Sequence, residues 1–142
     1  MILDSANAKR LILYFMYDKD GIVDDYVPYM LRELKKNSTE ILVVCNGKLT
    51  RESREKLQEV TPNVLVRENK GFDVWAYKTG LEYYGWDKIR SFDEVIMMNF
   101  TIMGPVYPLE EMFKTMDQRD LDFWGITMFH EYKEGLHLLP LQ

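Results

Sequence analysis

The feature that most constrains the fold is an almost wholly apolar run, Leu11 to Tyr17, directly after Arg10. It shows no alternation of polar and apolar residues, so both of its faces need to be covered by other parts of the protein. Such runs are typical of central strands in parallel sheets. We therefore predict a strand over Arg10–Tyr17 at the centre of an α/β domain.

The rest of the sequence alternates between strand-length apolar runs and segments with helical spacing. Further strands are predicted over 41–45, 64–67, 94–98 and 122–127, and helices over 23–36, 50–60, 73–84 and 108–116. The last fifteen residues show no clear period. This alternation implies right-handed crossovers and a mostly parallel sheet between layers of helices. We expect an α/β, three-layer α/β/α Rossmann-like fold, with residues 1–142 forming a single domain.

Particular residues set the predicted helix ends. Pro28 is tolerated only in the first turn of its helix, and Thr50 is placed to cap the next one. Asp73 is the predicted N-cap of the helix over 73–84, and Gly85 is its natural stop. Pro108 is expected in the first turn of the last helix.

Composition excludes several classes of protein. A net charge of −5 provides no basic surface for nucleic acid, so no nucleic-acid partner is expected. The apolar runs are too short to span a membrane, and no secretory signal is recognisable before Arg10.

Cys45, the single cysteine, falls inside a predicted strand and is expected to pack as a small hydrophobic residue. The simplest location is the cytoplasm.

Ligands of such sheets bind at the carboxyl ends of the strands. The segments to consider are therefore 18–21, 46–50, 68–73 and 99–105. The third of these is the most informative, because Asn69, Lys70 and Gly71 lie between a strand and the start of a helix. Free amides, an ammonium group and a glycine together suit phosphate or sugar hydroxyls. The alternative is a simple strand-to-helix turn without a ligand.

The first segment allows a different hypothesis. Asp18-Lys19-Asp20-Gly21 after an apolar strand is similar to the nucleophile loop of haloacid-dehalogenase-like phosphatases. That chemistry also needs acids after a later strand to hold magnesium, whereas residues 99–101 are Asn, Phe and Thr. Asp18 and Asp20 are better explained as residues that shape a turn. The phosphatase is kept as a minor alternative.

Taken together, four stretches resemble the rhamnan synthesis protein F family. They are 17–26 (YDKDGIVDDY), 67–73 (RENKGFD), Met98-Asn99 with Gly104-Pro105, and 122–127 (DFWGIT). More loosely, 43–47 (VVCNG) and 68–71 (ENKG) look like segments of GT-A nucleotide-sugar glycosyltransferases. The resemblance implies a GT-A-like fold and work on a rhamnose-containing cell-wall or capsular polysaccharide.

The resemblance also implies roles for individual residues. Tyr17, Asp18 and Asn46, with Gly47, would face the base and ribose of a nucleoside-diphosphate sugar. Lys70 and Asp73, with Asn69 and Gly71, would lie beside the nucleotide.

The implied metal site departs from the family pattern. Asn99 and Thr101 fall where GT-A enzymes bind Mg²⁺ or Mn²⁺ across the diphosphate, but Phe100 replaces the usual acid between them. Without a carboxylate, the leaving diphosphate loses charge stabilisation. Lys70 or Arg67 could supply positive charge instead.

The acceptor side is less defined. His130 and Glu131 are the candidates for a catalytic base, and the resemblance implies acceptor-side residues beyond Gln142, so a truncated domain is expected. The leading hypothesis is a glycosyltransferase-like domain that binds dTDP-rhamnose and acts on a polysaccharide or lipid-linked acceptor, in the cytoplasm or at the inner face of the membrane. The alternative is a degenerate, noncatalytic nucleotide-sugar-binding module.

Overall fold

The computed structural model describes the backbone of residues 1–132 and 135–140 and the side chains of residues 1–127. Its core is a four-stranded, all-parallel sheet with strand order β3-β2-β1-β4. The strands are β1 (Arg10–Asp18), β2 (Glu40–Gly47), β3 (Val64–Arg67) and β4 (Glu94–Asn99). The helices are α1 (Tyr26–Lys35), α2 (Arg51–Gln58), α3 (Phe72–Ile89) and α4 (Glu110–Asp117). The predicted three-layer α/β/α fold with a parallel sheet is confirmed.

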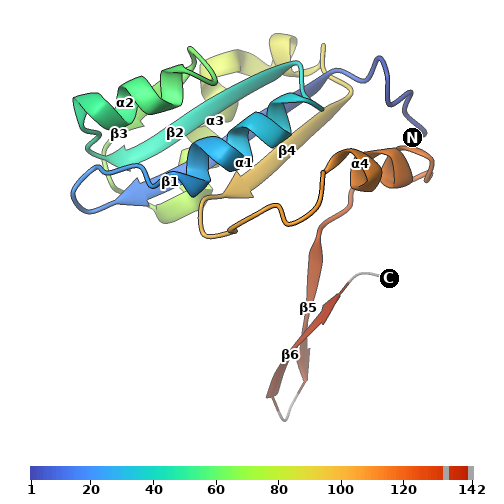
Figure 1. The fold of residues 1–142 in the computed structure, drawn as a ribbon. Coiled ribbons are helices and arrows are strands. Elements are labelled where there is room, and N and C mark those ends of the chain that lie inside the picture. Colours follow the sequence, from blue (N-terminus) through green and yellow to red (C-terminus); the bar gives the residue numbers. More distant parts are fainter. Residues whose placement is uncertain (133–134, 141–142) are drawn as a thin grey trace.

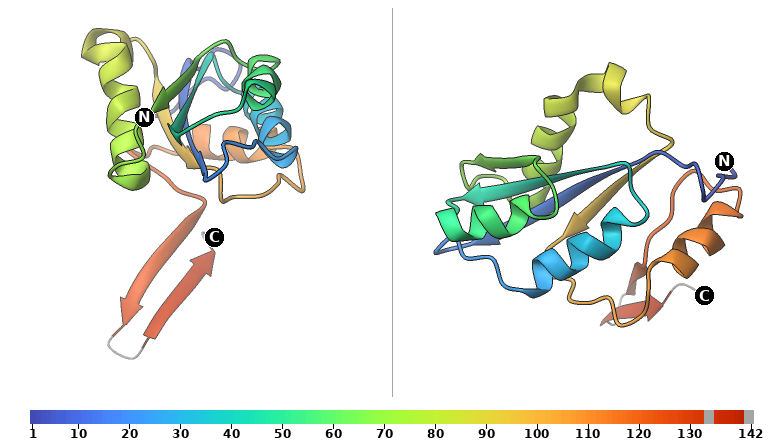
Figure 2. Two further views of the ribbon diagram at one scale, coloured as in Figure 1. Left: turned by 90° about the vertical axis from the view of Figure 1, so that its left-hand side faces the viewer. Right: turned by 45° about the horizontal axis from the view of Figure 1, so that its top comes forward.

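Strand β1 lies inside the sheet, hydrogen-bonded to β2 on one side and β4 on the other. Its side chains alternate between the two faces. Ile12, Tyr14 and Met16 join the core under α1, α2 and α4, whereas Leu11, Leu13 and Phe15 join the core under α3. Figure 2 shows α3 alone on one side of the sheet and α1 and α2 on the other. The unbroken apolar sequence of β1 is explained by this burial on both faces.

Three local predictions are correct, two about the starts of helices and one about Cys45. Thr50 caps α2, because its hydroxyl accepts a hydrogen bond of 3.1 Å from the Ser53 amide. Pro28 is the third residue of α1, within the first turn, where the lost amide has no helical partner. Cys45 is buried in β2 as a free thiol.

The predicted fifth strand over 122–127 is wrong. The structure has no regular strand between the end of β4 and Thr127, and β5 (Thr127–Tyr132) pairs antiparallel with β6 (Gly135–Pro140) in a separate two-stranded sheet. Figure 1 shows this hairpin extending away from the main body. Within 122–126, Trp124 packs edge-on against Phe113 of α4 and donates to the Glu94 carboxylate at 2.6 Å. The apolar pattern there therefore serves contacts to α4 and β4 instead of a sheet.

Helix α3 differs from the prediction at both ends. Its N-cap is Gly71, in the left-handed conformation, and Asp73 instead lies in the first turn, with its carboxylate accepting from the Val74 amide. Gly85 does interrupt the helix, with φ 73°, but helical structure resumes and continues to Ile89, which is buried against the sheet. Burial of Ile89 explains why the chain does not leave the helix at Gly85.

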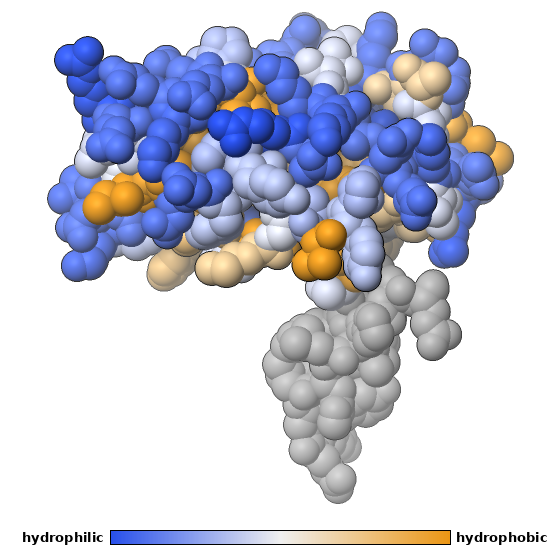
Figure 3. Space-filling model, in the orientation of Figure 1, coloured by the Kyte–Doolittle hydropathy of each residue, from blue (hydrophilic) through white to orange (hydrophobic). Residues whose placement is uncertain are grey.

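None of the helices among the described residues is long and apolar enough to cross a bilayer. Figure 3 shows a mostly hydrophilic face over α1 and α2, with small separate apolar patches.

Candidate functional site

The carboxyl ends of β1 to β4 and the loops after them lie at one end of the sheet, which we call the rim. The register pairs Tyr17 with Asn46, and Asn46 with Arg67, so the ends of β1, β2 and β3 are level. Adjacent loops also contact each other, since the Thr50 amide donates to the Gly21 carbonyl at 2.9 Å. The loops singled out in the sequence are therefore neighbours in space.

Asn46 connects the rim loops. It is 1% exposed, and its amide group donates to the Phe72 carbonyl at 3.1 Å and to the Asn69 side chain at 3.4 Å. Its side-chain oxygen accepts from the Arg67 guanidinium at 2.7 Å. The same guanidinium donates to the Lys70 carbonyl at 3.0 Å. One buried amide thus fixes the loop between β3 and α3 against β2.

Gly47 lies between two predicted site residues. A Cβ at this position would lie 3.7 Å from the Tyr17 ring and 3.8 Å from the Asn69 Cβ. Its φ of 83° is also a conformation that favours glycine. Tyr17, Gly47 and Asn69 therefore form one continuous patch beside Asn46.

The turn into α3 is strained at Phe72. Gly71 and Phe72 both have positive φ, 71° and 52°, and Phe72 is the one residue other than glycine with positive φ in the part of the chain that the structure describes. A side chain in this conformation costs roughly 1–2 kcal/mol. The ring is 83% exposed, so packing does not offset that cost. Asn46 holds the conformation by its hydrogen bond to the Phe72 carbonyl.

Phe72→Gly is expected to raise the free energy of unfolding by about 0.5–1 kcal/mol, because relief of strain exceeds the entropy that glycine adds to the unfolded chain. Urea denaturation measures the change. Val74→Gly is the matched control, since Val74 is also exposed but helical, and it should destabilise by about 1 kcal/mol. Equal destabilisation by both variants would contradict strain at Phe72.

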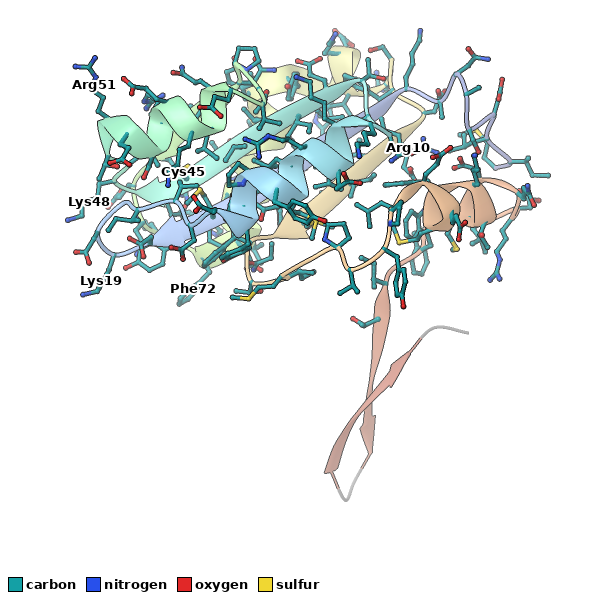
Figure 4. All side chains as sticks on the ribbon, viewed as in Figure 1. Arg10, Lys19, Cys45, Lys48, Arg51 and Phe72 are labelled. Carbon is teal, nitrogen blue, oxygen red and sulfur yellow. The ribbon has the colours of Figure 1, made fainter. Side chains whose placement is uncertain are left out.

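Two cations at the rim have no acidic partner. Arg67 and Lys70 form no ion pair within 4.0 Å with any acid whose side chain the structure describes. The Lys70 ammonium lies 5.5 Å from the centre of the Trp75 ring, which itself packs directly on Gly71. Figure 4 shows two further lysines, Lys19 and Lys48, at this end of the sheet. Acids lie at the same end of the sheet, among them Asp18, Asp20 and Asp73, so the rim carries charges of both signs.

Asp18 uses its carboxylate within its own loop. One oxygen accepts from the Ile22 and Asp20 amides, both at 2.9 Å. The bond from Ile22, with the weaker one from Asp20, holds the pKa of the Asp18 carboxyl below its usual range. Asp20 pairs with Lys19 at 3.3 Å. This is the geometry of a residue that shapes a turn, as the sequence suggested.

Cys45 is not available as a nucleophile at neutral pH. Burial raises the pKa of its thiol to about 12, so the thiolate is scarce.

The residues expected to hold a metal do not fit a divalent ion. The Asn99 oxygen accepts from the Thr101 amide at 3.1 Å, and the Asn99 amide faces the Asp73 carboxylate at 3.4 Å. Phe100 packs edge-on against Phe15, with centroids 5.9 Å apart, so this position faces the core. Among the side chains of residues 1–127, no cluster of three or more His, Cys, Asp or Glu is able to bind a metal. A single carboxylate and a neutral amide are a poor set for Mg²⁺ or Mn²⁺.

A separate cleft of about 750 Å³ runs along β4 and meets the rim at Asn99. Tyr77, Met97 and Trp124 are among its lining residues. The cleft does not include Asn46 or Lys70, so it is distinct from that part of the rim and meets it only at the end of β4, through Asn99 and Ile102.

The structure brings together Tyr17, Asn46, Gly47, Asn69, Lys70, Gly71, Asp73 and Asn99, while the polar groups of Asp18 and Thr101 serve their own loops. Two further residues at the rim, Phe72 and Trp75, were not among the expected site residues, and Arg67 was expected only as a source of positive charge. Arg67 links Asn46 to Lys70, Trp75 supports Lys70, and Phe72 is exposed at the turn. Arg67 lies at the end of a predicted strand, and that position indicated that it belongs to the rim. The backbone conformation of Phe72 has no sequence signature.

Comparison with protein families agrees with the resemblance that the sequence motifs indicated. Neither curated proteins nor solved structures gave a match to this chain. The family model of rhamnan synthesis protein F matches residues 41–142, which is more than half of the chain and includes β2 to β4 and the loops at their ends. The chain therefore belongs to the rhamnan synthesis protein F family.

Proposed function

We propose that this chain is a glycosyltransferase domain that binds a nucleoside-diphosphate sugar, dTDP-rhamnose, for the synthesis of a rhamnose-containing polysaccharide. Membership of the rhamnan synthesis protein F family supports a role in the synthesis of such a polysaccharide. The position of the rim at the carboxyl ends of parallel strands supports a nucleotide ligand, because open α/β sheets bind ligands there.

The observation that carries the proposal is the connection of the rim loops through Asn46. A buried amide at the end of β2 organises a loop that presents Lys70 beside two glycines, at positions 47 and 71. Glycines allow close approach of a ligand to the backbone, and an unpaired ammonium attracts a diphosphate. Tyr17 and Asn69, on the same patch, offer a ring and an amide to a base and ribose.

In the proposed reaction, an acceptor hydroxyl displaces the nucleoside diphosphate at the anomeric carbon of rhamnose. The bond from that carbon to the diphosphate oxygen breaks, and the acceptor loses its proton to a base. The acceptor is a polysaccharide or a lipid-linked glycan, and the latter would bring the domain to the inner face of the membrane. The candidate bases His130 and Glu131 have side chains outside the part that the structure describes.

The second candidate function is a noncatalytic nucleotide-sugar-binding module. The inward-facing Phe100 favours it, because an acid expected at this position in an active enzyme is absent. The two candidates share the binding site and differ in turnover alone. Transfer of labelled rhamnose from dTDP-rhamnose to an acceptor glycan would establish the enzyme, and binding without transfer or hydrolysis would establish the module.

Lys70→Ala is expected to weaken the affinity for dTDP about tenfold, because a charge-assisted contact to the diphosphate is lost. Calorimetry measures the dissociation constant, and Trp fluorescence gives a second signal because Trp75 lies beside Lys70. Lys78→Ala is the matched control. Lys78 is an exposed lysine on α3, the helix that follows the Lys70 loop, 3.7 Å from Glu82, and its loss should leave the affinity unchanged.

Absence of binding of both dTDP and UDP by the wild-type protein would overturn the proposed function. Equal weakening by Lys70→Ala and Lys78→Ala would show a nonspecific effect of charge, and would remove Lys70 from the site.

A further inference from the structure

Phe100 occupies the position where the family resemblance implies a metal-binding acid, and its side chain faces the core. Phe100 lies immediately after β4, and its amide donates to the Phe15 carbonyl at 2.9 Å, which continues the pairing of β4 with β1. Its ring packs on the Phe15 ring, and the Tyr26 hydroxyl donates to its carbonyl at 3.0 Å. These contacts fix the direction of the side chain, so the position does not present a ligand to the rim.

The neighbouring oxygens are also engaged. Asn99 directs its amide nitrogen at the Asp73 carboxylate and its oxygen at the Thr101 amide. Asp73 is the acid that hydrogen-bonds to Asn99 among residues 1–127, and one of its oxygens accepts from the Val74 amide at 2.9 Å. A divalent ion would have to displace these contacts and would gain a single carboxylate.

Positive charge is instead supplied by side chains on the loop between β3 and α3. The guanidinium of Arg67 is held by Asn46 and by the Lys70 carbonyl, which fixes the backbone of Lys70. The Lys70 ammonium stands over Trp75 and has no acid within ion-pair distance among residues 1–127. A cation without a partner, held on an ordered loop, can neutralise a diphosphate without an ion.

We propose that this protein binds the diphosphate of its nucleotide sugar without a divalent metal ion, through the ammonium of Lys70, with Arg67 as the residue that positions it. The inference rests on the proposed function, since it concerns the same nucleotide. It assigns to the Lys70 ammonium the charge that the family resemblance assigns to Mg²⁺ or Mn²⁺.

To test this, the full chain is titrated with dTDP in two buffers, one with Mn²⁺ and one with EDTA. Calorimetry gives the dissociation constant in each buffer. The expected dissociation constants agree within about twofold in the two buffers. Lys70→Ala should weaken binding about tenfold in both, and Lys70→Arg should retain most of the affinity because it keeps the charge. Affinity should also fall as salt is added, since exposed charges are screened.

Asp73→Asn distinguishes the two arrangements by the direction of its effect. If Lys70 alone neutralises the diphosphate, removal of a nearby negative charge should raise the affinity for dTDP by about twofold to threefold. If a metal ion bridges Asp73 and the diphosphate, the same variant should lose affinity in Mn²⁺.

The outcomes separate the two proposals. Binding that requires Mn²⁺ and disappears in EDTA would overturn this inference but leave the proposed function intact. Absence of dTDP binding in both buffers would overturn the proposed function itself. A loss of affinity in Asp73→Asn with Mn²⁺ present, alongside an unchanged melting temperature, would also overturn the inference.

Discussion

Asp117→Ala is expected to lower the free energy of unfolding by about 3–5 kcal/mol, because it leaves a buried guanidinium without its main partner. Arg10, at the start of β1, is 1% exposed and forms an ion pair with Asp117, which is 3% exposed, at the end of α4. It also donates to Glu94 at 2.8 Å and lies 4.8 Å from the centre of the Phe113 ring. Since domains are stabilised by about 5–15 kcal/mol in total, the loss is a large share.

Urea denaturation followed by circular dichroism measures this loss as a lower midpoint. Asp120→Ala is the matched control, because Asp120 is an exposed acid three residues further on that pairs with the chain's amino terminus, and its removal should leave the midpoint unchanged. The double variant Arg10→Met with Asp117→Leu should recover most of the stability, because it removes both charges from the interior. Equal midpoints for Asp117→Ala and Asp120→Ala would contradict a structural role for the buried pair.

The ion pair and the rim lie at opposite ends of the sheet. Arg10 and Glu94 begin their strands, whereas the rim residues end them, and Figure 4 shows Arg10 far from Lys19, Lys48 and Phe72. Under conditions where Asp117→Ala remains folded, its affinity for dTDP should therefore equal that of the wild-type protein. If the rim binds the ligand as proposed, stability and ligand binding should be separable, because different ends of the same strands carry them.

Much of the central sheet could be predicted because its signals are local. The apolar run of β1 is long, and Thr50 and Pro28 mark helix starts by their own chemistry. The buried ion pair could not be predicted, because Arg10 and Asp117 are separated by 107 positions and each is an ordinary charged residue in its own segment. Long-range pairing of this kind leaves no periodic signal in one sequence.

The errors have a common physical cause in tertiary contacts. Asp122 to Thr127 has the composition of a strand, but Trp124 contacts Phe113 and Glu94, which holds the segment against α4 and β4 in an irregular path. Gly85 has a positive φ and interrupts the helix as predicted, yet Ile89 is buried and α3 resumes. In both places, burial of one side chain outweighs a correct local preference.

The candidate site was predictable as a set of loops but not in its internal organisation. Parallel strands place their carboxyl ends together, so Asn46, Lys70 and Asn99 had to be near one another once the sheet was assumed. That Asn46 would be buried and would hold Phe72 in a left-handed conformation depends on side-chain packing. The sequence suggested that Asn46 would face the nucleotide, and the structure shows all of its described contacts directed at the loop.

Asn46→Ala is therefore expected to have two effects. It removes hydrogen bonds to Phe72, Asn69 and Arg67 from a buried position, which should lower the free energy of unfolding by about 2–3 kcal/mol. It should also weaken dTDP binding by at least about tenfold, because the loop that carries Lys70 is no longer fixed and pays an ordering cost on binding. Urea denaturation measures the first effect and calorimetry the second.

Asn63→Ala is the matched control for Asn46→Ala, and Asn46→Asp separates the contacts. Asn63 is a partly buried asparagine at the opposite end of the sheet, 3.5 Å from Glu40, so its loss should affect stability without affecting dTDP affinity. Asn46→Asp keeps an acceptor for Arg67 but loses the donor to Phe72, and its affinity should fall between those of the wild-type protein and Asn46→Ala. If Asn46→Ala bound dTDP as tightly as the wild-type protein, the loop would be ordered without Asn46. The rim would then owe its shape to the glycines and the strand ends alone.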